Sequence, residues 1–80
     1  MPRLKILSSE DVIKTLGSFD FVIIFQKGGH IKFRRIVDGM KQTLTAPNHR
    51  ELDKGTLRAI FNQASRYISE SELRPYFYNK

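Results

Sequence analysis

The sequence predicts a single α+β domain in which helices cover one face of a three-stranded antiparallel sheet. Two segments carry apolar residues at helical spacing, one near the start of the chain and one after its midpoint. Between them lie three segments rich in β-branched and aromatic residues, separated by two glycine-containing turns. The length of 80 residues is that of one small domain. We therefore expect the order α-β-β-β-α over a core at about residues 4–68, followed by a helical extension at 69–80.

The first predicted helix covers residues 8–17, with the sequence SSEDVIKTLG. Ser8 is followed three residues later by Asp11, a spacing similar to the capping box that starts many helices. An apolar stripe follows at helical spacing, formed by Val12, Ile13 and Leu16. Gly17 is the residue type that commonly ends a helix.

The first predicted strand lies within residues 19–27, FDFVIIFQK, which are rich in β-branched and aromatic side chains. Residues 21–25 are apolar without alternation, and this pattern is typical of a strand that is covered on both faces. Gly28 and Gly29 follow. Because glycine tolerates a positive φ, these two residues allow a tight hairpin turn into the next strand.

The second predicted strand, residues 30–36 with the sequence HIKFRRI, alternates between two faces. One face carries Ile31 and Phe33, and the other carries His30, Lys32 and Arg34. Arg34 and Arg35 are adjacent, so they point to opposite faces and at most one of them shares the face of His30.

A second turn signal, Asp38 followed by Gly39, comes after this strand. The third predicted strand is residues 41–46, KQTLTA, and Pro47 ends it because proline cannot donate to a sheet ladder. The loop that follows leads to the second predicted helix from about Asp53.

The second predicted helix covers residues 53–68 and is amphipathic. Its apolar face, which we expect in the core, consists of Leu57, Ile60, Phe61, Ala64 and Ile68. Its polar face consists of Lys54, Arg58, Asn62 and Arg66.

The C-terminal segment SESELRPYF offers a capping box at Ser69 and Glu72 and predicts a short third helix. Pro75 either ends this helix or begins a tail that packs through Tyr76 and Phe77. Double-stranded-RNA-binding domains share the order of the core elements, although order alone is a weak argument for function.

Composition limits the classes of function. Fourteen lysines and arginines against eight acidic residues give a formal charge of +6, which favours a polyanionic partner such as nucleic acid or an acidic protein. The absence of cysteine excludes disulfides and thiolate zinc sites, and two histidines without a carboxylate cluster make a metal site improbable. No apolar run is long enough for a membrane span, and the opening MPRLKILSSE lacks a signal-peptide core. We expect a soluble, cytoplasmic protein with no membrane partner.

Three stretches, in this order, resemble the HicA toxin family. LSSEDVIKTL is similar to the family pattern LSxxEVIKxL, and FQKGGHIKF is similar to RQKGSHHxY. APNH followed by ELDKGTLRAIFNQA is similar to VPxH followed by ELxxGTLRxILRQA. The resemblance covers roughly residues 4 to 65, with matching spacing between the stretches.

The resemblance implies a double-stranded-RNA-binding-like fold and a toxin of a toxin–antitoxin system that cleaves mRNA without a metal or a small-molecule cofactor. It implies one catalytic histidine, which falls on His30, and a HicB-like antitoxin that blocks the active site. The family glycine falls on Gly28, whereas Gly29 replaces the usual serine and Ile31 replaces the usual second histidine. Phe33 stands where an aromatic residue often follows, and it lacks a hydroxyl group.

An imidazole suits RNA cleavage because RNA carries its own nucleophile, the 2′-hydroxyl beside the scissile phosphate. His30 is expected to transfer protons, and Lys32 and Arg34 on the same face are expected to hold phosphates beside it. Other expected RNA contacts are Lys27, Gly28 and Gly29 at the turn and Lys54 and Arg58 at the start of the second helix.

Several alternatives remain open at this stage. Lys54 and Arg58 equally fit an ordinary solvated helix face, and His49 is either a second acid–base group or a loop residue that caps or contacts the antitoxin. If the helices cover only one sheet face, Val22 and Ile24 remain exposed as a partner surface unless residues 76–78 cover them.

The function itself also has two readings. The first is an endoribonuclease that acts through His30. The second is a catalytically silent RNA-binding or protein-binding module on the same fold, in which His30 is only an exposed strand residue. The replacements at Gly29 and Ile31 motivate the second reading.

Overall fold

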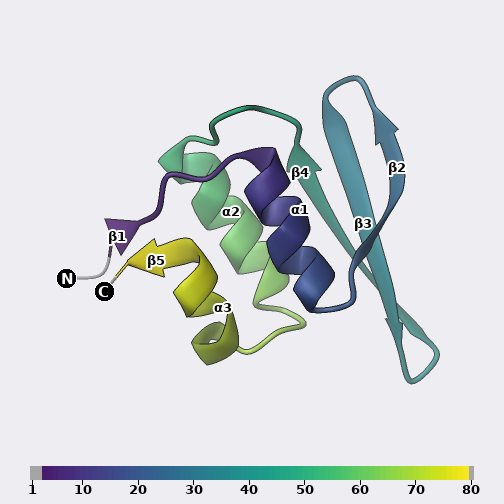
Figure 1. The fold of residues 1–80 in the computed structure, drawn as a ribbon. Coiled ribbons are helices and arrows are strands. Elements are labelled where there is room, and N and C mark those ends of the chain that lie inside the picture. The colour runs from purple at the N-terminus through teal and green to yellow at the C-terminus, as the bar shows by residue number, and fades with distance from the viewer. Residues whose placement is uncertain (1–2, 80) are drawn as a thin grey trace.

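The computed structural model describes residues 3–79 and has two layers (Figure 1). One layer is an antiparallel sheet of three strands in the order β2-β3-β4. The strands are β2 Val22–Lys27, β3 His30–Val37 and β4 Met40–Pro47. Helices α1 Ser9–Ser18 and α2 Lys54–Ala64 pack on one face of this sheet, and α3 Glu70–Phe77 packs beside them. The predicted α+β fold with helices on one face is confirmed.

The predicted capping box starts α1. The Asp11 N–H donates to the Ser8 hydroxyl over 3.1 Å, and the Ser8 N–H donates to the Asp11 carboxylate over 2.9 Å. The helix runs through Gly17 to Ser18, one residue beyond the expected end. The left-handed residue that turns the chain is Asp20, with a φ of 72°, and aspartate adopts this region more readily than most residues.

Both predicted hairpin turns are present. Gly28 and Gly29 have φ values of 58° and 78°, and Asp38 and Gly39 have φ values of 51° and 77°. Two successive positive φ values match the right-handed twist of the flanking strands and set the register. His30 pairs with Lys27 on one side and with Pro47 on the other.

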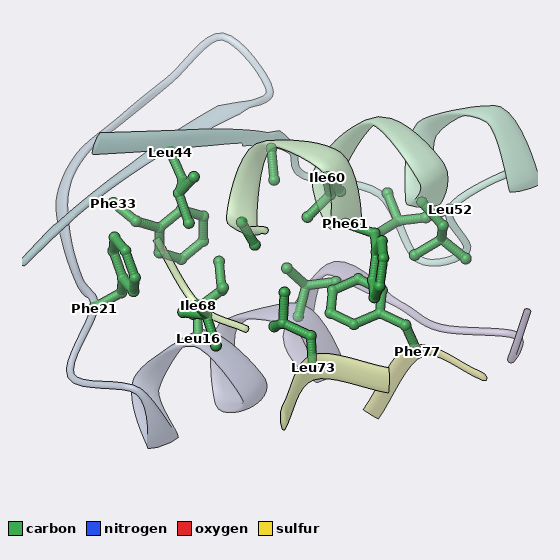
Figure 2. Close-up of a cluster of buried hydrophobic side chains, with 14 of the residues drawn as sticks. Leu16, Phe21, Phe33, Leu44, Leu52, Ile60, Phe61, Ile68, Leu73 and Phe77 are labelled. Carbon is green, nitrogen blue, oxygen red and sulfur yellow. The ribbon is translucent and has the colours of Figure 1, made fainter. Parts of the chain in front are cut away.

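The core lies between the sheet and the helices, as Figure 2 shows. β3 supplies Ile31 and Phe33, and β4 supplies Leu44 and Ala46. The helical layer supplies Val12, Leu16, Leu57, Ile60, Phe61, Ala64, Leu73 and Phe77. Because the helices bury only one face of the sheet, the opposite face of β3 and β4 is left open.

β2 differs from the pattern that its sequence indicates. All six of its residues are exposed, including Val22 at 61%, Ile24 at 42% and Phe25 at 54%. The expectation that both faces of this strand are covered was wrong, because β2 is an edge strand and only Phe21, just before it, reaches the core. Residues 76–78 do not cover it either, because they lie on the far side of the helices.

The end of α2 also differs from expectation. The helix ends at Ala64, and Ile68 is buried from the turn that follows rather than from the helical face. Pro75 lies inside α3 instead of ending it, so the helix continues to Phe77 with one backbone donor missing. Phe77 is fully buried, whereas Tyr76 is 41% exposed.

Two short strands that the sequence did not reveal join the ends of the described chain. β1 Arg3–Leu4 pairs antiparallel with β5 Tyr78–Asn79. The Lys5 N–H also donates to the Phe77 carbonyl over 2.8 Å, which fixes the N-terminal segment against α3. Within residues 3–79, no helix is long and apolar enough to cross a membrane.

Candidate functional site

His30 stands at the first position of β3, directly after the glycine turn, and its side chain is exposed. Its cross-strand partner on β2 is Lys27, so imidazole and ammonium share the open face of the sheet. The loop after β4 contacts this turn, because the Asn48 N–H donates to the Gly29 carbonyl over 2.7 Å. The hairpin therefore presents the imidazole to solvent.

The open face of the sheet carries positive charge next to His30. Lys32 lies between Phe25 and Thr45, and Arg34 lies in the next row of the same face. The sequences of β2, β3 and β4 contain no acidic residue. With no carboxylate on these strands to neutralise it, this face attracts anions.

Arg34 has an unusual environment on this face. The side chain is half-buried, and within residues 3–79 its Nε atom is enclosed without a hydrogen-bond partner. An enclosed donor without a partner is costly and gains from an added acceptor. A phosphate oxygen on the open face is one acceptor that would satisfy it.

Arg35 points the other way and has a structural role. Its guanidinium donates to the carbonyls of Phe19 and Tyr67 over 2.9 and 2.8 Å and lies 4.8 Å from the centre of the Phe21 ring. Its Nε also donates to the Gln42 side chain over 2.6 Å. Only Arg34 of the pair therefore shares the face of His30, as the alternation predicts.

His49 is held mainly through its backbone. Its N–H donates to the Ser9 hydroxyl over 2.6 Å, and its carbonyl accepts from the Ser9 N–H over 3.0 Å. The exposed side chain lines a pocket of about 580 Å³ with Ser8, Ser9, Glu10, Asn48 and Arg50. The loop after β4 thus lies between the start of α1 and the glycine turn, which puts both histidines in the same region of the fold (Figure 1).

The other two predicted RNA-binding residues lie elsewhere. Lys54 and Arg58 occupy the first turns of α2, on the side of the molecule away from the β2–β3 turn (Figure 1). They line a separate pocket of about 270 Å³ together with Arg3, Leu4 and Tyr78. The predicted residues therefore form two groups, with Lys27, Gly28, Gly29, His30, Lys32 and Arg34 in the first group.

Sequence reasoning missed Arg3 and Tyr78 as neighbours of Lys54 and Arg58. The signal is weak because two-residue strands carry no periodicity, and the pairing of β1 with β5 joins opposite ends of the chain. Within residues 3–79, no three histidine, aspartate or glutamate side chains gather as a metal site would require.

Comparison with known protein families gives a match over the core of the fold. The family model described as HicA toxin of bacterial toxin–antitoxin matches residues 9–65, which is more than half of the chain. This range contains α1, the whole three-stranded sheet and α2, and it leaves α3 and both short strands outside. Searches of curated proteins and of solved structures found no match.

Proposed function

The chain belongs to the HicA toxin family, and on that premise we propose that it is a metal-independent endoribonuclease that cleaves mRNA through His30. A HicB-type antitoxin holds it inactive. The observation that supports this proposal is the exposed imidazole of His30 on a cationic sheet face whose strands carry no acidic residue.

The proposed reaction uses the nucleophile that RNA provides. The 2′-oxygen attacks the neighbouring phosphorus, a new P–O2′ bond forms, and the bond from phosphorus to the 5′-oxygen breaks. His30 accepts the proton of the 2′-hydroxyl, and the imidazolium so formed, or water, protonates the leaving 5′-oxygen. One such acid–base group contributes about 10²–10⁴-fold to the rate.

The residues around His30 supply the electrostatic part of the reaction. Lys27 lies directly across from it, and Lys32 and Arg34 follow on the same face of β3. These cations hold the phosphates and stabilise the extra negative charge of the transition state. The glycine turn adds backbone N–H groups with no side-chain bulk around them, because a Cβ added at Gly28 or Gly29 would meet nothing within 4 Å.

The family differences affect this site unequally. Ile31 is fully buried under the helices, on the face opposite His30. A residue at this position therefore packs in the core and does not reach RNA on the open face. Gly29 lies in the turn itself, so the missing serine hydroxyl is the difference that concerns catalysis.

The antitoxin has a natural docking place at β2. This strand lies at the edge of the sheet, and its apolar side chains Val22, Ile23, Ile24 and Phe25 are 41–61% exposed. Exposed apolar edges are rare in isolated domains because they invite pairing with another strand. We infer that an antitoxin strand adds to this edge through backbone hydrogen bonds and that acidic antitoxin residues cover Lys27 and Lys32.

A cleavage assay in EDTA tests the catalytic proposal. We expect the wild-type protein to cleave mRNA and His30→Ala to lose about 10²–10⁴-fold in rate, because the proton acceptor is removed. Expression of the wild type without antitoxin should arrest growth, and expression of the variant should not.

His49→Ala is the matched control, because it removes the other histidine. Retained cleavage supports a mechanism with one histidine, whereas a loss equal to that of His30→Ala indicates a pair. If the folded wild type binds RNA and leaves it intact, the proposal of cleavage is wrong and the chain is a silent binding module.

A further inference from the structure

We propose that the pocket between β1, α2 and β5 binds a backbone phosphate of the RNA at a distance from the bond that is cleaved. This inference rests on the proposed function. It concerns Arg3, Lys54, Arg58 and Tyr78. Arg3 and Tyr78 lie outside the range of the family match.

The fold brings three cations together at this pocket. Lys54 and Arg58 are one helical turn apart on exposed positions of α2, so both side chains extend over the same side of the helix. Arg3 reaches the same place because its strand pairs with Asn79 and Leu4 pairs with Tyr78. All charged residues that line the pocket are therefore positive.

No carboxylate within residues 3–79 forms an ion pair with Lys54 or Arg58. Asp53 accepts the Thr56 N–H over 2.7 Å as the N-cap of α2. Glu70 pairs with Arg74 over 3.7 Å, which is the one ion pair within residues 3–79. Lys54 and Arg58 thus have no acidic partner in this part of the chain, and a phosphate would supply the missing negative charge.

The Tyr78 ring forms an aromatic wall of the pocket and is fixed in place. The Phe61 ring meets it edge-on at 5.3 Å, and the Arg74 guanidinium lies 5.4 Å from its centre. A fixed aromatic ring beside cations is the combination that single-stranded nucleic acid uses, with the base or ribose on the ring and the phosphate on the cations.

The pocket is small, with a volume of about 270 Å³. We expect it to hold one phosphate of the RNA with its sugar. An acidic peptide is the competing occupant, and the binding of the antitoxin to Arg58→Gln distinguishes it from RNA.

The position of the pocket determines which RNA can use it. Figure 1 shows the paired strands β1 and β5 on the other side of the helices from the β2–β3 turn, and the longest dimension of the molecule is 38 Å. At about 3.4 Å per stacked nucleotide, about 11 nucleotides span this length. A stacked strand of about 5 nucleotides is shorter than this dimension and one of about 20 nucleotides is longer, so we expect only the longer RNA to reach both groups of cations.

Fluorescence anisotropy with labelled RNA of these two lengths tests the proposal. Every protein compared carries the His30→Ala substitution, so that no RNA is cut. We expect the long RNA to bind more tightly than the short one. Arg58→Gln should weaken binding of the long RNA by about tenfold, because one charge-assisted contact is lost. It should also lower the slope of log K against log salt by about 0.7. Tyr78→Leu should weaken binding of the long RNA without changing this slope.

Arg66→Gln is the matched control, because it removes an equal charge from an exposed arginine just beyond the end of α2. If Arg58→Gln and Arg66→Gln lose equal RNA affinity, only the net charge matters. The proposal that this pocket binds RNA is then wrong. An Arg58→Gln variant that binds RNA normally but binds the antitoxin weakly would assign the pocket to the protein partner.

The two proposals fail separately in this design. If binding of the long RNA depends on Arg58 but the wild-type protein does not cleave RNA, the proposed nuclease activity is wrong and the proposed phosphate site stands. If the wild type cleaves and both RNA lengths bind Arg58→Gln normally, the phosphate site is wrong and the nuclease stands.

Discussion

Arg34 and Arg35 show how one strand gives two neighbouring residues opposite roles. Arg35 extends from β3 to the helical side of the sheet and donates to the Phe19 and Tyr67 carbonyls. Arg34 stands on the open face with an Nε atom that lacks a partner within residues 3–79. Alternation along β3 predicts this division, but the two carbonyls that accept from Arg35 belong to distant segments that no local pattern reveals.

Alanine substitutions at two glycines should change the stability of the protein in opposite directions. Gly29→Ala should destabilise the protein by about 1–2 kcal/mol, because a φ of 78° is unfavourable for any residue with a Cβ. Gly17→Ala should stabilise it by about 0.5–1 kcal/mol, because Gly17 lies inside α1 with open space around it. Urea unfolding measures both changes. Shifts of the same sign would contradict this account of the turn.

At the scale of elements, both principal helices use a carboxylate at their N-terminus: Asp11 in the capping box of α1 and Asp53 as the N-cap of α2. A hydrogen bond from the Ser8 backbone N–H, with a smaller contribution from the Ser8 hydroxyl, holds the pKa of the Asp11 carboxyl below its usual value of 3.8. Hydrogen bonding from the Thr56 backbone does the same for the pKa of Asp53. Each ionised carboxylate thus favours the folded state.

These caps predict the direction of acid sensitivity. A carboxyl whose pKa is lower in the folded state contributes stability that is complete above the unfolded pKa, near pH 4, and is lost as pH falls through the lower folded value. The double variant Asp11→Asn, Asp53→Asn should therefore lose less stability between pH 5 and pH 2 than the wild type. Thermal unfolding at several pH values measures this, and equal losses would count against the caps.

Elements with strong local signals were predictable from the sequence. The Ser8 and Asp11 box, the two positive-φ turns and the alternation of β3 each follow from residues that are close in the chain. Pro75 inside α3 was not predictable, because distant contacts hold that turn. Lys5 donates to the Pro75 carbonyl across a separation of 70 residues.

At the scale of the whole molecule, the exposure of β2 is the feature that the apolar sequence concealed. An apolar run is compatible with a strand buried on both faces and with an edge strand that waits for a partner. Only the packing of the helices distinguishes the two, because they extend over β3 and β4 and leave β2 outside. The candidate site itself was predictable as far as His30 and its turn, whereas the pocket between the chain ends was not.

Ile24→Lys tests the role of this edge. We expect it to weaken binding of a cognate antitoxin by at least about tenfold, because a charge replaces an apolar residue of the proposed interface. The unfolding midpoint should change little, since Ile24 is 42% exposed and outside the core. Titration calorimetry measures the affinity.

Ile36→Lys is the control for this experiment, because Ile36 is 65% exposed at the other end of the sheet. Antitoxin affinity that falls equally in both variants would place the contact on the general sheet surface and not at β2.

The pairing of Arg3 with Asn79 has a practical consequence for how this protein is handled. Because these two residues are paired, the described chain starts and ends beside the same cations, Arg3, Lys54 and Arg58. A purification handle at either end would therefore be attached close to that pocket. Acidic handles would compete with RNA there, and histidine-rich ones would add nitrogen donors close to it, so affinities are best compared on material from which every appended residue has been removed.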